Sequence, residues 1–396
     1  MPAAVLTRPV DGPATGGPVR GLARRRAARR LRWTTLGIVV AGVLATGLGT
    51  VDVRPAAVSG GIPESMAPEP MPPRGGTVPR APMPAGPPPV AGPSTAETVP
   101  GAPAAGGSGP LTAFTGETGR PFAADSAWNT RLPGDPVIDA NSAAMVAAIT
   151  PRGRAYANIY EFGDPVFTAD ASTPTATVEC TEKWGPCDLE DRPLRIPLEA
   201  RPTTGSDGRV IVVDLVDRTS CDFWQAVRVS ATRWTASWGT CGSLDGDGRG
   251  GATGAGVNAL TGVVRTYEMR DLEIPHALSV ATNNSCAGEY RYPASKTDGW
   301  SSRPDCIPEG ARLQLDPSID IDAIPGITPG EKAVARALQT YGAINRDNSG
   351  SPLCISFETP IGEADPYPAA GFGWDYYDMP HIPWDRLRVL RSWDGG

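Results

Sequence analysis

The chain has 396 residues, seven cysteines and a formal net charge of −7 at pH 7. Nine of the ten tryptophans and all nine tyrosines follow residue 113, so a folded core is expected only there. Many of the arginines lie near the N-terminus, so the remainder of the chain is more acidic than the whole. This charge argues against binding to nucleic acid or to an anionic lipid surface.

The first predicted element is a transmembrane helix at residues 34–51. Arginines crowd the stretch before it, and its eighteen residues carry no charge. A spanning helix needs about 20 apolar residues, with a lower limit near 17, and flanking arginines stay cytoplasmic. We therefore expect a basic cytoplasmic tail at residues 1–33 and a single-pass cell-membrane protein whose remainder is extracytoplasmic. The alternative is a cleaved secretory signal, but Ala45–Gly47 is a poor cleavage site.

Residues 52–112 are predicted to form a disordered stalk. The stretch 53–110 contains 16 prolines, many glycines and alanines, and no aromatic residue. Such a composition buries too little apolar surface to offset the entropy of ordering, and proline-rich chains favour extended polyproline II. We expect a passive tether that holds an extracytoplasmic domain, residues 113–396, away from the membrane.

The domain at residues 113–396 is predicted to be mainly β. Short runs of alternating apolar and polar residues indicate strands. One helix is expected after Thr328, where Pro329 and Glu331 complete a capping pattern, and a shorter one at 142–149. Many strands with few helices predict an antiparallel β-sandwich or jelly roll. The predicted strands are 154–162, 194–198, 209–216, 223–229, 233–238, 261–268, 277–281, 311–315 and 353–357.

All seven cysteines lie in this domain, which predicts disulfides formed in an oxidising compartment. Local loop closure favours pairs of sequence neighbours, although spacing alone leaves other connectivities open. Cys354 lies in an apolar run and is expected to be a buried free thiol. The cysteine spacing fits no zinc site, and we expect neither a metal nor a cofactor. The expected pairs are Cys180–Cys187, Cys221–Cys241 and Cys286–Cys306.

The candidate catalytic residues follow one of the two histidines, His276. A histidine at the start of a strand, with carboxylates and arginines nearby, suits general-base chemistry. The alternative is a structural histidine. In the polar and aromatic loop that follows, Glu289 or Asp298 would donate a proton, and Arg291 would orient or neutralise a sugar.

Aromatic residues beside carboxylates are the candidate substrate-binding groups. Sugar C–H groups stack on aromatic faces, while carboxylates accept hydrogen bonds from hydroxyls. Tyr290 and Trp300 lie in the same loop as the candidate proton donors. Trp374, Asp375 and Tyr377 lie near the C-terminus, where packing over the sheet is the alternative explanation.

The glycine-rich loop at residues 243–256 is expected to be a flexible turn. No lysine follows its glycines as in a phosphate-binding loop, and Arg249 stands where an EF-hand has a ligand. Asp245 and Asp247 could hold calcium in an extracellular β protein, but we favour the turn.

Several segments follow one another in a recognisable order: Trp234–Gly239, Pro275–Leu278, Tyr292–Ala294, Asp298–Gly299, Ile307–Leu313 and Asp320–Asp322. This order resembles a broad group of exported, largely uncharacterised proteins from actinobacteria and related bacteria. The resemblance covers residues 121–358 and implies a β-sandwich outside the cell. It assigns no catalytic residue.

These features predict a membrane-tethered domain that binds or acts on carbohydrate of the cell envelope or the environment. As an enzyme it would be a polysaccharide lyase or a glycoside hydrolase. The alternatives are a non-catalytic glycan-binding or adhesion module and a structural envelope protein with a protein partner. The sequence leaves open which of these applies, and it leaves the oligomeric state open.

Overall fold

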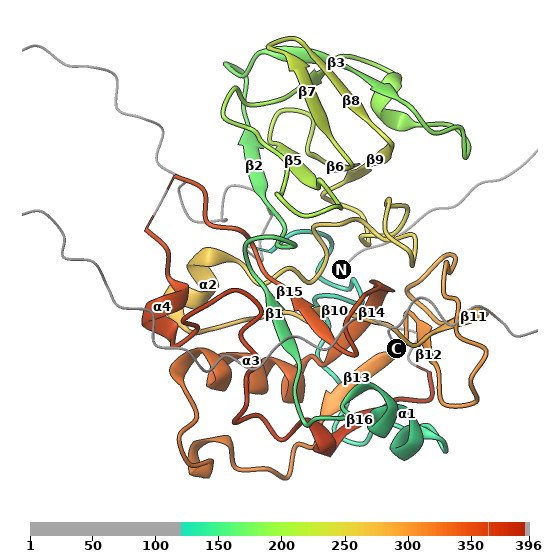
Figure 1. Ribbon diagram of the computed structural model, residues 1–396, viewed down its shortest axis with the longest axis vertical. Coiled ribbons are helices and arrows are strands. Elements are labelled where there is room, and N and C mark those ends of the chain that lie inside the picture. The colour runs from blue at the N-terminus through green and yellow to red at the C-terminus, as the bar shows by residue number, and fades with distance from the viewer. Residues whose placement is uncertain (1–119, 363, 393–396) are drawn as a thin grey trace, which may run out of the picture. The chain divides into compact units, whose positions relative to one another are not determined.

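The computed structural model describes residues 120–362 and 364–392, which form a mainly β structure with four short α-helices (Figure 1). Its main sheet has six strands in the order β1-β15-β10-β14-β13-β16. In that order the strands are Tyr156–Asn158, Cys354–Ser356, Leu278–Thr282, Ala343–Asn348, Arg312–Leu315 and Leu387–Val389.

Strand pairing in the main sheet is mixed. β1 runs parallel to β15 and β10 runs parallel to β14, while the other contacts are antiparallel. The antiparallel arrangement predicted from the sequence therefore holds only in part. Parallel neighbours need long crossover connections. Here the chain leaves the sheet after β1 and enters it again at β10, and the parallel partner of β1, β15, follows only later in the chain.

The long excursion between β1 and β10 builds two four-stranded sheets, which we call the paired sheets (Figure 1, green to yellow). One has the order β2-β5-β6-β9: Val166–Ala169, Val210–Asp214, Thr219–Trp224 and Trp238–Ser243. The other has the order β4-β3-β8-β7: Leu194–Arg195, Thr175–Cys180, Arg233–Ala236 and Val227–Ser230. Both bury their apolar side chains in one common core, which includes Phe167, Val178, Val212, Phe223 and Trp234.

The helices pack on the main sheet through a second core. It joins Val146 of α1 and Val334 of α3 to sheet residues such as Leu278, Leu313 and Ile355. A separate two-stranded parallel pair is formed by β11 (Ser285–Tyr290) and β12 (Ile307–Glu309). The helices are α1 (Ser142–Ile149), α2 (Thr266–Asp271), α3 (Pro329–Thr340) and α4 (Tyr367–Ala370), with 3₁₀ turns at Asp188–Glu190, Ile321–Ala323 and Trp384–Arg386.

Both predicted helices are confirmed, and α3 begins as its capping pattern predicts. Thr328 Oγ1 accepts a hydrogen bond from the Glu331 nitrogen at 3.2 Å, and the Glu331 carboxylate accepts one from the Thr328 nitrogen at 2.9 Å. The strand predicted at 261–268 is wrong, because α2 begins within it. There Glu268 accepts a hydrogen bond from the Arg265 nitrogen at 2.8 Å, which fixes a helix start.

The three predicted disulfides, Cys180–Cys187, Cys221–Cys241 and Cys286–Cys306, are all present, and Cys354 is a buried free thiol. Among the described residues, no helix is long and apolar enough to cross a membrane. The predicted tail at 1–33, span at 34–51 and stalk at 52–112 lie outside the described residues.

Candidate functional site

Three carboxylates that are far apart in the sequence converge beside the glycine-rich loop. Asp298 lies between β11 and β12, Glu309 ends β12, and Asp347 lies near the end of β14. One oxygen of each lies within 4.8 Å of the others. We call these three residues the carboxylate cluster. Within the described part of the chain, it is the one group of three histidine, cysteine or acidic side chains that converges so closely.

The backbone of Gly254 packs directly against these carboxylates. A Cβ atom built on Gly254 would lie 2.5 Å from Asp298 Oδ1, 2.7 Å from Asp347 Oδ1 and 2.8 Å from Glu309 Oε1. Carbon and oxygen atoms do not approach so closely without a bond, so any other residue would collide with all three. Lys296 holds the loop in place, because its Nζ donates to the Gly254 carbonyl at 2.9 Å.

Glu309 is the innermost member of the carboxylate cluster and is fully buried. Its Oε1 has no hydrogen-bond partner among the described residues, while Oε2 accepts a long 3.4 Å bond from the Asp298 nitrogen. Burial, followed by the charges of Asp298 and Asp347, raises the pKa of Glu309 to about 9. Burial also raises the pKa of Asp347, against the opposing charge of Arg209. The cluster therefore needs a proton or a cation at neutral pH.

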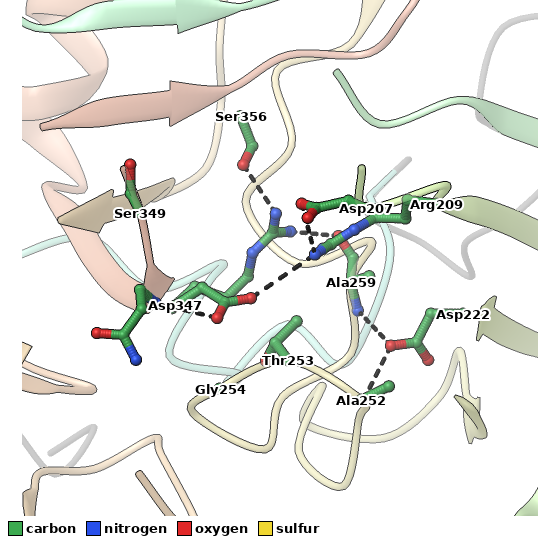
Figure 2. Close-up of polar contacts among 12 residues, drawn as sticks. Asp207, Arg209, Asp222, Ala252, Thr253, Gly254, Ala259, Asp347, Ser349 and Ser356 are labelled. Carbon is green, nitrogen blue, oxygen red and sulfur yellow. Dashed lines mark hydrogen bonds and ion pairs between the residues drawn. The ribbon is translucent and has the colours of Figure 1, made fainter. Parts of the chain in front are cut away.

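Two arginines lie next to the carboxylate cluster, the buried Arg346 and the largely buried Arg209, and Figure 2 shows Arg209 beside Asp347. Arg346 on β14 pairs with Asp164 at 3.1 Å. Arg209 lies 3.6 Å from both Asp164 and Asp347, and 3.9 Å from Asp207. Since Asp164 precedes β2 and Arg209 precedes β5, these ion pairs connect the paired sheets to the main sheet.

The charges of this region do not balance. Two guanidinium groups face Asp164, Asp207 and the three members of the carboxylate cluster. Lys296 is directed to a backbone carbonyl, and Asn348 donates its amide to Asp298 without adding charge. Uncompensated carboxylates in a partly buried region are costly, so the site favours an additional positive charge.

Asp222 on β6 fastens the end of the glycine-rich loop (Figure 2). Its carboxylate accepts hydrogen bonds from the nitrogens of Ala252 at 2.9 Å and Ala259 at 3.3 Å, and from Thr240 Oγ1 at 3.1 Å. Burial raises the pKa of Asp222 to about 6, although these hydrogen bonds and Arg209 act in the opposite direction. Because both carboxylate oxygens of Asp222 accept hydrogen bonds, we assign Asp222 the role of holding the loop in position.

His276, the predicted general base, is buried with both ring nitrogens engaged. Nδ1 lies 2.9 Å from the Ala277 carbonyl oxygen and Nε2 lies 3.1 Å from Glu268. Burial acts to lower the pKa of His276, but Glu268 and the Ala277 carbonyl outweigh it and raise the pKa. Both partners accept hydrogen bonds, which favours the charged ring. This geometry favours the structural alternative for His276.

Glu268, which lies in α2, belongs to a buried ionic group. It bonds the Arg265 backbone, and the Arg265 guanidinium pairs with Glu358 at 2.9 and 3.1 Å. We call Arg265, Glu268, His276 and Glu358 the balanced cluster, since it contains two cationic and two anionic groups.

The other predicted catalytic residues are divided between two places. Arg291 pairs with Asp139 at 2.8 Å and donates to the Leu390 carbonyl at 2.9 Å, so it fastens its loop to the rest of the domain. Glu289 is exposed and lies 3.7 Å from Arg291. Asp298 is the one of the four that lies in the carboxylate cluster.

The predicted substrate-binding aromatics differ in exposure. Tyr290 and Trp300 are both exposed, and Trp300 Nε1 donates to the Asn283 carbonyl at 3.2 Å. Trp374 is also exposed, whereas Tyr377 is buried beneath it, with ring centroids 4.9 Å apart in an edge-to-face arrangement. Tyr377 therefore supports Trp374 and is itself inaccessible.

Asp375 organises the surface around Trp374. Its carboxylate accepts hydrogen bonds from the backbone nitrogens of Ile159, Tyr160, Glu161 and Tyr376, at 2.9–3.2 Å. Two phenol–carboxylate pairs flank it. Tyr160 donates to Asp365 at 2.6 Å and Tyr376 donates to Glu161 at 2.5 Å. We call Tyr160, Glu161, Asp365, Trp374, Asp375 and Tyr376 the aromatic–acidic surface.

Glu309 and Asp347 were not predicted from the sequence. Glu309 alone had a weak signal, because it is a charged residue at the end of a short apolar strand segment, Ile307–Glu309, whereas Asp347 lies in the largely polar run Asn345–Asn348. Charged residues are rarely buried unless they are paired or bind an ion. No pattern along the chain indicates that these two strands bring their carboxylates together.

Comparison with known proteins gives no match: no family model, no curated protein and no solved structure matches this chain. The resemblance to exported actinobacterial proteins therefore stays a prediction.

Proposed function

We propose that this protein is an exported carbohydrate-binding protein, held at the membrane by residues 34–51, and that it binds glycan at the aromatic–acidic surface. The supporting observation is an exposed Trp374 ring beside a carboxylate, Asp375, that is already bonded to four backbone nitrogens. The three disulfides fit an oxidising, extracytoplasmic compartment.

The chemistry of this surface suits a sugar. The Trp374 indole is held edge-to-face on Tyr377, so little side-chain entropy is lost when a pyranose ring stacks on it. Glu161 and Asp365 each accept one phenol hydroxyl, and their remaining lone pairs can accept sugar hydroxyls. Binding at a preorganised surface needs no movement of the backbone.

Glycan cleavage is the second candidate, and the carboxylate cluster is the observation that favours it. A protonated Glu309 beside two further carboxylates resembles an acid–base pair. However, glycosidases separate their two carboxyl groups by about 5–5.5 Å or about 6.5–9.5 Å. The cluster oxygens lie within 4.8 Å of one another, so they are closer than either mechanism uses.

The experiment is a glycan array combined with a product assay on the full chain, purified without reductant. Trp374→Ala should weaken binding about tenfold or more, because it removes the stacking ring. Trp184→Ala is the matched control, since Trp184 is exposed to 63% and Trp374 to 57%. New reducing or unsaturated ends would establish cleavage. Unaltered affinity in Trp374→Ala would refute the proposed surface, and the absence of any glycan binding would favour a protein partner.

A further inference from the structure

We propose that the carboxylate cluster is a calcium site, with Asp298, Glu309 and Asp347 as ligands. The inference is independent of the proposed carbohydrate binding. It rests on the convergence of the three side chains and on a buried ligand atom, Glu309 Oε1, that has no partner among the described residues.

The dimensions of the cluster fit a calcium ion. Calcium binds oxygen ligands at about 2.3–2.6 Å, so oxygens on opposite sides of one ion are about 4.6–5.2 Å apart. The cluster oxygens are all within 4.8 Å of one another. They can therefore share one ion without a change in the backbone.

The donor set is made of oxygen atoms, which hard cations prefer over the softer transition metals. Glu309 is fully buried and would be the inner ligand, whereas Asp298 is exposed and leaves a path to solvent. Through that path water can complete the coordination. Asn348 donates its amide nitrogen to Asp298, which orients this outer carboxylate toward the cluster.

Electrostatics gives an independent reason for a cation. Arg209 divides its charge among Asp164, Asp207 and Asp347, and within the described part of the chain neither Asp298 nor Glu309 forms an ion pair with a cationic side chain. A divalent ion would supply the missing charge. A proton shared within the cluster at Glu309 is the competing explanation. If the cluster binds calcium, Glu309→Gln should abolish the stabilisation by calcium. If the cluster shares a proton, the wild-type protein should not respond to calcium, and Glu309→Gln should be equally or more stable.

Asp245 and Asp247, the two aspartates of the glycine-rich loop, already have hydrogen-bond partners. Arg218 donates twice to the Asp245 carboxylate, at 2.8 and 2.5 Å, and Asp247 accepts a hydrogen bond from the Arg249 nitrogen at 3.0 Å. These two aspartates therefore provide a matched control with similar charge and a different position.

The test measures thermal unfolding of the full chain in metal-free buffer, with and without calcium, together with calorimetric titration of CaCl₂. For extracellular sites, about 10 mM calcium should raise the melting temperature by about 5 °C. Glu309→Gln should abolish the shift, and Asp245→Asn should retain it. Gly254→Ala should also abolish it, since the added methyl group would collide with all three ligand oxygens while leaving the charges unchanged.

Three results would overturn the proposal. The first is a wild-type protein that neither binds nor responds to calcium, with Glu309→Gln equally or more stable; the cluster would then share a proton. The second is a shift that survives in both Glu309→Gln and Gly254→Ala but disappears in Asp245→Asn. The third is an equal response to magnesium, which would contradict the choice of ion.

Discussion

The balanced cluster and the carboxylate cluster are both ionic groups that are partly or fully buried. They differ in whether the free-energy cost of burying the charges is offset by charges of opposite sign. In the balanced cluster, two cationic and two anionic side chains hold one another at 2.9–3.1 Å. In the carboxylate cluster, three anions converge and one buried oxygen lacks a partner. Buried charges that are fully paired indicate a structural role, and buried charges that are unbalanced indicate a place for a ligand.

The largest expected difference in stability comes from replacing one glutamate of each cluster with glutamine. Glu358→Gln should destabilise the protein by about 3–5 kcal/mol, because it leaves the buried Arg265 guanidinium without its anionic partner. Glu309→Gln in metal-free buffer should cost little, since glutamine resembles the protonated acid. Denaturant unfolding without reductant measures both. Equal losses for the two variants would remove the distinction between the clusters.

The next effect concerns the disulfide that closes the loop carrying Asp298. Cys286→Ala with Cys306→Ala opens a loop of sequence separation 20 and should cost about 3 kcal/mol. It should also weaken the calcium response, because Asp298 loses its fixed position. The control is Cys180→Ala with Cys187→Ala, which opens a loop of separation 7 in the paired sheets and should leave the calcium response intact. A calcium response that survives in the first variant would show that the loop is held without its disulfide.

The smallest effect is a pH dependence in the balanced cluster. The pKa of His276 is raised in the folded protein by Glu268 and the Ala277 carbonyl. The stability that it contributes is therefore fully present below the unfolded pKa of about 6.5 and is lost as pH rises through the folded pKa. His276→Gln should cost about 1–2 kcal/mol at pH 6 and less at pH 9, as measured by urea unfolding at each pH. A cost that grows with pH would show that His276 is neutral in the folded protein.

Local patterns in the sequence predicted local structure well. The capping pattern at Thr328 and Glu331 involves residues three apart, and the disulfides join neighbouring cysteines, so both were visible along the chain. The segment 261–268 misled because the apolar Val263 and Val264 suggest a strand. The deciding contact was Glu268 with the Arg265 nitrogen, which starts a helix instead.

Contacts between segments that are far apart in the chain could not be predicted from local sequence patterns. His276 attracted attention because Glu268 and other charged residues lie near it in the chain, yet Glu268 is its ion-pair partner and occupies Nε2. The carboxylate cluster joins positions 298, 309 and 347 through three separate elements, and Asp298 alone was a candidate. Periodicity and composition describe one segment at a time, so they could not bring these three together.

The way the main sheet is closed has a consequence for how the chain matures. β1, near the start of the described residues, pairs with β15, and Ile138 bridges to Leu390 close to their end. During synthesis the N-terminal part emerges first. β1 and α1 therefore remain without their packing partners, β15 and β16, until nearly the whole domain has been synthesised. The paired sheets, whose strands all lie between residues 166 and 243, can assemble meanwhile. A chain interrupted before β16 would leave the apolar face of α1 uncovered, and it would be a natural substrate for chaperones and proteases.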